Sequence, residues 1–220
     1  MALFRLEDVK FRSQTQEIIK GISLEIEKGS VNIFSGMAGS GKSTLLKLTA
    51  GILVPSGGKV FYKDMDIQTM SNAKNRQFRR ECSFVFQDSA LWANQNIQQN
   101  LDLVLQTQRP ELDAKARLER IKEMCEIVHY ERALTLRPVD LSMGEQKKIA
   151  FARAMINDPE TLFLDECTES LDRKTSTVIM NLIRKFIDDG NTVIYVSHNT
   201  TFVTEFTGNV FAIAEGLLLD

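Results

Sequence analysis

The sequence feature that most constrains the fold is the segment Gly-Met-Ala-Gly-Ser-Gly-Lys-Ser at residues 36–43, which fits the pattern G-x-x-x-x-G-K-[ST]. An apolar run, residues 30–35, leads into it, and apolar residues at intervals of three and four follow it as far as Gly51. A strand that passes through a glycine loop into a helix is typical of a parallel α/β sheet, where backbone N–H groups of the loop surround a phosphate. The segment therefore predicts an α/β fold with a nucleotide at one edge of its sheet.

The residue types of this loop suit a triphosphate. Glycine at positions 36, 39 and 41 lets the backbone approach the phosphates, Lys42 brings positive charge to the β- and γ-phosphates, and the Ser43 hydroxyl can reach Mg²⁺. A glycine-rich turn with a surface lysine is the structural alternative, but it explains neither the strand before the loop nor the helix after it. The predicted phosphate-binding set is Gly36, Met37, Ala38, Gly39, Ser40, Gly41, Lys42, Ser43 and Thr44.

Length and composition narrow the class of protein. The chain has 220 residues, 43% of them hydrophobic and 25% charged, which is the balance of a soluble globular protein. A formal net charge of −2 provides no basic face for nucleic acid, and three cysteines without a C-x-x-C pair argue against a disulfide scaffold or a zinc knuckle. The sequence shows neither a secretory signal nor an apolar stretch of roughly 18 residues. We therefore expect a cytoplasmic chain without a nucleic-acid partner.

The pattern of apolar residues predicts the order of the elements. Residues 1–35 alternate with a period of two, as antiparallel strands do, and the apolar runs 161–165 and 192–197 are candidates for buried strands. A helical stripe lies between these two runs and is closed by Asp189 and Gly190. Strand, helix and strand at this spacing form a β-α-β unit, which predicts a parallel sheet.

Residues 88–158 differ from the rest of the chain. They are rich in Gln and charged residues, and their pattern predicts helices over 112–129 and 143–157. The expected fold class is α/β: a P-loop NTPase core with an N-terminal antiparallel β sub-domain and an inserted helical sub-domain. A single domain, residues 1–220, would then contain an α/β core formed by 1–87 and 159–220 and a helical sub-domain at 88–158.

Further motifs follow the phosphate loop in a fixed order. Residues 141–145 are Leu-Ser-Met-Gly-Glu, and an apolar run ends in the acidic pair Asp165 and Glu166. Ser-Leu-Asp then ends at Asp172, and Val-Ser-His ends at His198. In this order the set resembles the ATP-binding cassette (ABC) ATPases, over essentially the whole chain. The resemblance implies an enzyme that hydrolyses ATP with Mg²⁺, as a head-to-tail dimer in which each ATP lies between the phosphate loop of one copy and residues 141–145 of the other.

Physical chemistry gives roles to several of these residues independently. A carboxylate at the end of a buried strand beside the phosphate loop, as Asp165 is, can hold Mg²⁺. Glu166 follows at the edge where α/β sheets bind ligands, which suits a general base for a water molecule. A solvated acidic turn is the alternative, but the apolar residues before the pair are the wrong composition for one. Ser142 and Gly144 begin a helix and offer a second anion site.

The resemblance adds the remaining site residues. It implies catalytic roles for Gln87 and His198 beside Glu166: Gln87 touches Mg²⁺ and the water, and His198 donates to the γ-phosphate. It also implies that Asp172 passes signals between the paired sites and lies with Ser142 and Gly144 in the nucleotide-binding set. The implied metal ligands are Ser43, Gln87 and Asp165. The other histidine, His129, is expected on the surface.

Four positions depart from the family pattern. The aromatic residue that usually stacks on adenine falls on Ser13, with Phe11 two residues earlier, so either Phe11 stacks or nothing does. Met143 stands where glycine is usual and Glu145 where glutamine is usual, and bulk near the γ-phosphate is expected to slow closure of the dimer. Cys167 replaces the usual proline after the acidic pair, with a small expected effect.

The resemblance implies a partner in a membrane. The first hypothesis is the ATPase subunit of a multi-subunit transporter that drives integral-membrane permease subunits from the inner face of the cell membrane. Leu91 and Trp92, apolar residues in a polar stretch, suit a socket for a partner helix, with core packing as the alternative. Residues 86–101 resemble those of Mla/Mce-type lipid-transport ATPases, which implies lipid as cargo and a lipid- or substrate-binding subunit.

Two other functions remain as alternatives. A signalling or scaffold ATPase of the cell-division or lipoprotein-release type would control a membrane partner without import. A soluble nucleotide kinase is disfavoured, because no acceptor-substrate motif accompanies the phosphate loop and Ser142 and Gly144 would have no role.

Overall fold

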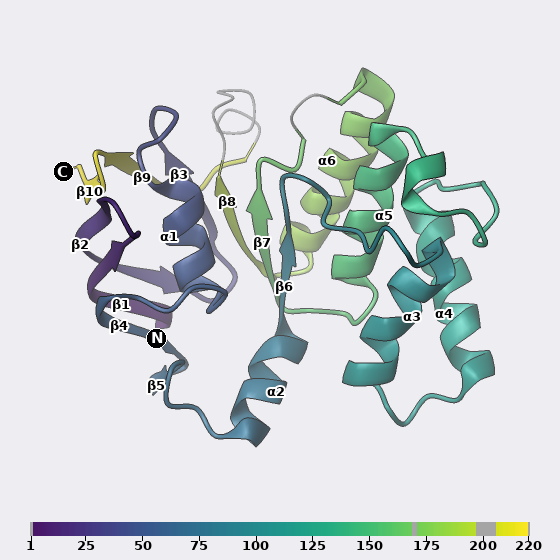
Figure 1. The fold of residues 1–220 in the computed structure, drawn as a ribbon, viewed down its shortest axis with the longest axis horizontal. Coiled ribbons are helices and arrows are strands. Elements are labelled where there is room, and N and C mark those ends of the chain that lie inside the picture. Colours follow the sequence, from purple (N-terminus) through teal and green to yellow (C-terminus); the bar gives the residue numbers. More distant parts are fainter. Residues whose placement is uncertain (1, 169–170, 197–205, 220) are drawn as a thin grey trace.

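The strands of the chain form two sheets. The computed structural model describes residues 2–168, 171–196 and 206–219 (Figure 1). Within them, a four-stranded sheet has the order β2-β1-β4-β5 and a six-stranded sheet has the order β10-β9-β3-β8-β7-β6. The helices α3 to α6 lie to one side of the six-stranded sheet in Figure 1, and the four-stranded sheet lies to the other. This arrangement confirms the predicted α/β class with an antiparallel β sub-domain.

The smaller sheet is antiparallel throughout. Strands β1 and β2 pair as the alternation of residues 1–35 predicts, for example Leu6 with Leu24, and β1 also pairs with β4. Ile22, Leu24 and Ile26 of β2 are buried and the residues between them are exposed, because one face of this sheet covers the core. Its strands are β1 (Ala2–Arg12), β2 (Glu17–Glu27), β4 (Gly57–Tyr62) and β5 (Met65–Asp66).

The larger sheet is parallel except at one edge. Strands β6, β7, β8, β3 and β9 run parallel in that order, and β10 pairs with β9 in the antiparallel sense. The carboxyl ends of β3 and β7 therefore open at the same edge, where α/β sheets bind ligands. The strands are β3 (Val31–Ser35), β6 (Cys82–Val85), β7 (Thr161–Asp165), β8 (Thr192–Val196), β9 (Asn209–Ala214) and β10 (Leu217–Leu218).

The predicted helices are present, together with others. The helices predicted over 112–129 and 143–157 are α4 and α5, and α3 and α2 join them. Helix α6 connects β7 to β8, as the β-α-β unit requires. The helices are α1 (Lys42–Thr49), α2 (Asn72–Glu81), α3 (Ile97–Gln108), α4 (Ala114–Ile127), the 3₁₀ helix η1 (Pro138–Asp140), α5 (Met143–Met155) and α6 (Arg173–Asp188).

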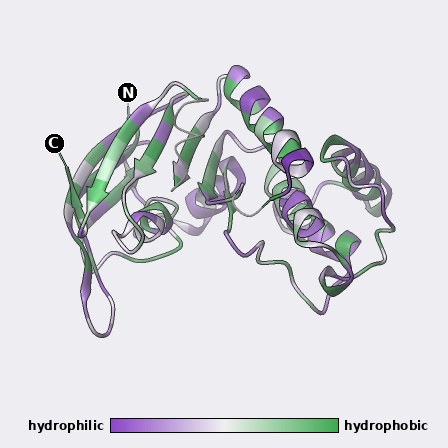
Figure 2. Ribbon diagram, turned by 90° about the horizontal axis from the view of Figure 1, so that it is seen from above, coloured by the Kyte–Doolittle hydropathy of each residue, from purple (hydrophilic) through white to green (hydrophobic). Residues whose placement is uncertain are grey.

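The six-stranded sheet is covered on both faces. Leu162 and Leu164 of β7 belong to a hydrophobic cluster shared with α3 to α6, whereas Phe163 between them belongs to a second cluster shared with α1 and the antiparallel sheet. Successive side chains of a strand point to opposite faces, so a strand buried on both faces is apolar without a break. The helices carry both hydrophilic and hydrophobic residues in Figure 2, as expected where one side of each is buried.

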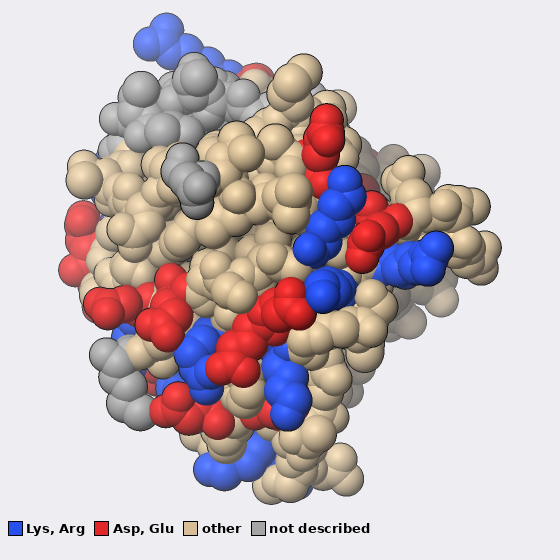
Figure 3. Space-filling model, turned by 90° about the vertical axis from the view of Figure 1, so that its left-hand side faces the viewer, with Lys and Arg blue, Asp and Glu red and all other residues tan. Residues whose placement is uncertain are grey.

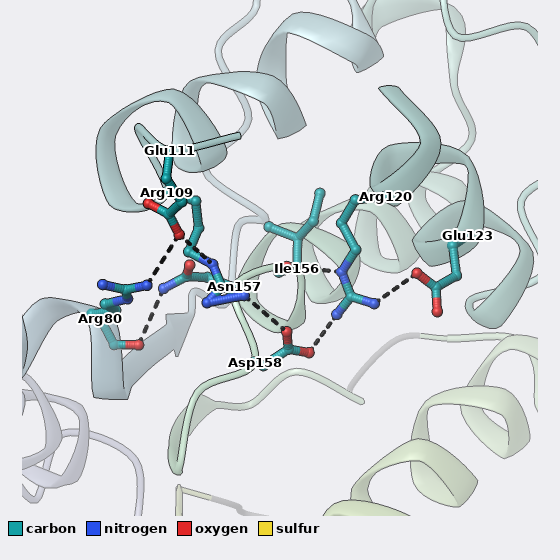
Figure 4. A network of polar contacts seen from close by, with 8 residues as sticks. All are labelled: Arg80, Arg109, Glu111, Arg120, Glu123, Ile156, Asn157 and Asp158. Atoms are coloured by element: carbon teal, nitrogen blue, oxygen red, sulfur yellow. Dashed lines mark hydrogen bonds and ion pairs between the residues drawn. The ribbon is translucent and has the colours of Figure 1, made fainter. Parts of the chain in front are cut away.

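A polar network joins the helices to the core at one corner (Figure 4). Asp158, between α5 and β7, pairs with Arg120 of α4 and lies 3.7 Å from the guanidinium of Arg109. Glu111 lies 3.4 Å from Arg80 of α2, and Asn157 donates to the backbone oxygen of Arg80 over 3.2 Å. The network fixes the loops at the amino-terminal end of β7, opposite the edge where Asp165 ends the strand.

The surface carries charges of both signs. On the face seen in Figure 3, acidic and basic side chains lie among one another. Some surface charges form pairs, for example Lys10 with Asp8 at 2.9 Å. Exposed pairs of this kind contribute little to stability. None of the described helices combines the length and the apolar character that crossing a membrane requires.

Candidate active site

The phosphate loop lies between β3 and α1 and shapes a cavity. Gly36 has φ 145, and a Cβ there would lie 2.1 Å from the backbone oxygen of Ile213, so only glycine fits. Gly41, with φ 104, is the N-cap of α1 and turns the chain into the helix. The cavity above the loop has a volume of about 250 Å³. It is lined by Gln16, Ile18, Gly39, Gly41, Lys42, Ser43 and Thr44.

Lys42 is buried within the loop. Only 3% of it is exposed, and its ammonium group donates to the backbone oxygen of Met37 over 2.7 Å. Met37 itself is 84% exposed, so the loop turns this side chain outward and its carbonyl inward. The same ammonium group lies 3.5 Å from Ser40 Oγ. A lysine ammonium in a glycine loop at the start of a helix adds its charge to the backbone N–H groups that can bind an anion. The geometry suits the phosphates of a nucleotide.

Asp165 lies next to the loop, at the end of β7. Its Oδ1 accepts a hydrogen bond from the Ser43 hydroxyl over 2.7 Å, and its Oδ2 lies 3.5 Å from the ammonium of Lys47. Only 2% of Asp165 is exposed. The sequence prediction did not include Lys47, although its spacing of four from Ser43 places both on one face of α1. A hydroxyl and a carboxylate at this distance are the hard oxygen ligands that Mg²⁺ accepts beside phosphate.

Glu166 is held in a strained and buried position. Its φ is 47, its N–H donates to the backbone oxygen of Val196 over 3.1 Å, and 5% of it is exposed. A left-handed conformation costs a residue with a side chain roughly 1–3 kcal/mol, and it persists where the surroundings impose it. The amide Nε2 of Gln87 donates to Glu166 Oε2 over 2.6 Å. The structure therefore brings together two residues that the sequence places in one catalytic set.

The segment after β6, residues 87–92, is bound to α5. Lys147 donates to the backbone oxygen of Gln87, and Arg153 donates to those of Ser89 and Ala90 over 2.9 and 2.6 Å. The Arg153 guanidinium also lies 5.4 Å from the ring centre of Trp92, which is 43% exposed. The sequence prediction missed both basic residues. Their only signal was two cations on a helix with many buried positions.

Ser142 begins α5 and forms a capping box with Glu145. The Ser142 Oγ accepts from the Glu145 N–H over 3.2 Å, and Glu145 Oε2 accepts from the Ser142 N–H over 2.8 Å. Met143 beside them is 58% exposed. Helices α1 and α5 lie on opposite sides of β7 and β8 in Figure 1. The hydrophobic clusters agree, because Leu162 and Leu164 of β7 pack in the cluster that includes α5, whereas Phe163 packs in the one that includes α1.

Asp172 and Gly144 are distant in the sequence but lie close together in the folded chain. Asp172 is the N-cap of α6, and hydrogen bonds from Thr175 hold the pKa of its carboxyl below the ordinary value. A Cβ on Gly144 would lie 3.2 Å from Asp172 Oδ2 and 3.1 Å from Thr175 Oγ1, so glycine lets the starts of α5 and α6 approach. The predicted His198 lies outside the described residues.

The position predicted for adenine stacking has no aromatic residue in this structure. Phe11 packs against the hydrophobic cluster of the antiparallel sheet and does not line the cavity at the phosphate loop. Ser13 accepts from Gln16 N–H over 3.2 Å in the turn between β1 and β2. Stacking by Phe11 and the absence of stacking both stay predictions from the sequence.

A parallel sheet with a glycine loop after β3, and with an acidic pair that begins at the last residue of β7, is typical of a P-loop nucleotide hydrolase. Residues 19–169 match the ABC transporter family. The chain therefore belongs to the ABC transporter family, as an ATP-binding subunit with ATPase activity.

Individual relatives agree with this assignment. An uncharacterized ABC transporter ATP-binding protein of Thermotoga maritima is 37% identical over 192 residues, which cover 87% of this chain and 81% of that protein. The methionine import ATP-binding protein MetN 1 of Enterococcus faecalis is 32% identical over 96% of this chain and 60% of its own length. The dimeric post-hydrolysis structure of the ATP-binding cassette MJ0796, bound to ADP and Pi, superposes with a TM-score of 0.87 at 28% identity, covering 99% of this chain and 97% of that one.

Proposed function

We propose that two copies of this chain bind head to tail around ATP and that hydrolysis of this ATP drives a membrane permease. Each nucleotide would lie between the loop around Lys42 of one copy and the start of α5, with Ser142 and Gly144, of the other. The observation that carries the proposal is that α1 and α5 lie on opposite sides of β7 and β8 (Figure 1), so the sheet separates the helix that Ser142 begins from the helix that follows the phosphate loop. The MJ0796 cassette, which this chain resembles over 99% of its length, is dimeric with ADP and Pi.

Glu166 is proposed as the general base for the attacking water. It lies one residue beyond Asp165 at the edge of the sheet, and only 5% of its surface is exposed to solvent. The Gln87 amide, 2.6 Å away, orients its carboxylate. Lys42 would neutralise charge on the β- and γ-phosphates, and the N–H groups at the start of the second copy's α5 would bind the γ-phosphate from the far side.

The residues around Ser43 fit a magnesium ion. The Ser43 hydroxyl and the Asp165 carboxylate lie 2.7 Å apart. Gln87, whose amide nitrogen donates to Glu166, is added as a ligand from the family pattern. Mg²⁺ is held by one or two carboxylates together with substrate phosphates, and when bound it neutralises phosphate charge. Ser43, Asp165 and Gln87 are therefore the proposed ligands. His198 is proposed, from the family pattern alone, as a donor to the γ-phosphate.

The segment 87–92 is the proposed contact with the permease. Trp92 is 43% exposed and braced by Arg153, and Leu91 packs against the core, so one of the two predicted socket residues is available at the surface. Such a partner would place the chain on the inner face of the cell membrane. The helices within 88–158 are proposed to move as a sub-domain with this segment, because α5 holds it through Lys147 and Arg153.

Transport is preferred here to signalling because relatives carry transport names, among them methionine import and an energy-coupling factor transporter. Lipid cargo, with a lipid-binding subunit, stays a prediction from residues 86–101. Purification of the chain with its own membrane partner, followed by identification of the co-purified chains and lipids, tests both. A multi-span permease supports transport, and a partner that carries no cargo favours the scaffold alternative.

The dimer and the base are tested together with Glu166→Gln. The amide keeps the shape and the contact to Gln87 but cannot take a proton, so ATP binding is expected to persist while turnover stops and a dimer accumulates. Light scattering with Mg²⁺ and ATP should then give twice the mass of one 24.9 kDa chain. Hydrolysis at the parent rate would remove Glu166 as the base, and a monomer with bound ATP would contradict the dimer.

A further inference from the structure

Lys147 is a buried cation that the mechanism above does not use. It lies on α5, near Ser142 at the start of that helix, and only 4% of it is exposed. Its ammonium group donates to the backbone oxygen of Gln87. An ammonium group is costly to bury, and a charge-assisted hydrogen bond to a carbonyl offsets part of that cost. The contact therefore ties the position of the Gln87 carbonyl to α5.

The side chain of Gln87 is held at the same time by a different element. Its Nε2 donates to Glu166 Oε2 over 2.6 Å, and Glu166 follows β7. One residue thus links α5 to the proposed general base, through its carbonyl on one side and its amide on the other. Both groups are attached to the same Cα, so a shift of the Gln87 backbone that follows Lys147 changes the position from which the amide reaches Glu166.

Arg153 holds the next residues of the same segment to α5. It donates to the backbone oxygens of Ser89 and Ala90, whose φ angles of 64 and 45 are left-handed. Residues with side chains keep that conformation where contacts impose it. The segment after Gln87 therefore follows α5 as well, and Lys147 holds the residue nearest to the catalytic carboxylate.

We propose that Lys147 is a positioning residue for hydrolysis. When Ser142 binds the nucleotide held by the second copy, Lys147 changes the orientation of Gln87 and Glu166 in its own chain. The inference rests on the proposed function, because it takes Ser142 as the closing residue and Glu166 as the base. When α5 moves to the nucleotide held by the second copy, Lys147 moves the Gln87 carbonyl with it. Closure at one site then adjusts the base of the other.

The first test replaces Lys147 with Met, which keeps the length and removes the charge and the donor. We expect kcat to fall by up to about 100-fold, the scale of a misplaced catalytic group, while KM for ATP changes less than about threefold. Lys148→Met is the matched control, since Lys148 is the next residue and donates to the backbone oxygen of His129 over 2.9 Å, outside the site. It should keep the parent kcat. Lys147→Gln retains an N–H donor and should recover part of the loss.

The second test asks whether Lys147 acts through Gln87. In a Gln87→Ala background, Lys147→Met should lower kcat no further, because residues that act as one unit are not additive. Parent kcat in Lys147→Met, or an equal loss with and without the Gln87 side chain, would overturn the inference. Glu166→Gln distinguishes failure of the proposed function from failure of the role of Lys147. Hydrolysis by Glu166→Gln would contradict the proposed function. An inactive Glu166→Gln together with a fully active Lys147→Met would contradict only the role of Lys147.

Discussion

Ser43 donates from its Oγ to Oδ1 of Asp165 over 2.7 Å, which joins the first turn of α1 to the last residue of β7. The two residues are 122 positions apart in the chain, and they meet because β3 and β7 end at the same edge of a parallel sheet. Lys42 and Thr44 are the chain neighbours of Ser43, and Glu166 is the chain neighbour of Asp165, so this contact joins the phosphate loop to the acidic pair.

This contact predicts how hydrolysis depends on Mg²⁺. A chelator is expected to stop turnover, and Asp165→Asn should raise the Mg²⁺ concentration for half-maximal hydrolysis, because one full negative charge leaves the oxygen set. Asp66→Asn is the control, since Asp66 pairs with Lys59 at 3.8 Å outside the site. The same Mg²⁺ dependence in the parent and in Asp165→Asn would show that Asp165 is not a ligand.

The cavity at the phosphate loop predicts which residues contact the nucleotide base. Ile18 lines it and Phe11 does not. Phe11→Ala should therefore leave the dissociation constant of a non-hydrolysable ATP analogue within about twofold, while Ile18→Ser weakens binding by up to about tenfold, through roughly 1.4 kcal/mol of lost apolar contact. Isothermal titration calorimetry measures both. A larger loss in Phe11→Ala than in Ile18→Ser would identify Phe11 as the residue that stacks on adenine.

The exposed Met143 side chain leads us to expect faster ATP hydrolysis when it is replaced by glycine. Its side chain is 58% exposed at the first position of α5, where the family pattern has glycine and where the second copy's nucleotide is expected. Met143→Gly should raise kcat by easing closure, at a cost of less than about 1 kcal/mol in the free energy of unfolding. Steady-state hydrolysis and urea denaturation test the two parts. A lower kcat with a weaker dimer would mean that the methionine supports the interface.

Glu81 predicts a pH-dependent part of the stability. Burial raises the pKa of Glu81, but hydrogen bonds from Tyr62, Lys63 and Gln77 outweigh it and hold the pKa below the ordinary 4.5. A depressed folded-state pKa adds stability above the unfolded value, and this contribution is lost as the pH falls through the folded-state pKa. Glu81→Gln should therefore lower the free energy of unfolding most near neutral pH and progressively less below pH 4.5. An equal loss at every pH would contradict the assignment.

Local patterns were sufficient for part of the fold. The strand β7 was predicted to the residue, because all five positions from Thr161 to Asp165 are buried and such a run fits few other structures. The phosphate loop was predicted equally well, since its glycines fix the backbone locally, as φ 104 at Gly41 shows. The order of the strands and the presence of β9 depend on tertiary packing. The apolar pattern of short segments does not predict either of them.

The site was predictable where a residue type carries its own chemistry, and less so where packing decides. Glu166 and Gln87 were expected in one set, and their 2.6 Å contact is consistent with that expectation. Lys147 was not predicted, because the carbonyl to which it donates lies 60 positions away in the chain. Phe11 was left open for the same reason, since its packing against the core depends on the register of β1 and β2.

The central claim is that each ATP lies between two copies, and two inactive variants test it in combination. Lys42→Ala removes the charge of the phosphate loop. Ser142→Asp keeps an oxygen that caps α5 but places a carboxylate before the γ-phosphate. Each variant alone is expected to be inactive, since both sites of its dimer are damaged.

A mixture of the two variants forms some dimers that contain one of each. Such a dimer has one intact site, made of Lys42 from the Ser142→Asp copy and Ser142 from the Lys42→Ala copy. The direct measurement is ATP hydrolysis by the equimolar mixture, compared with the sum of the two variants assayed separately. The account predicts that the mixture clearly exceeds that sum, and a mixture no more active than its separate components would contradict it.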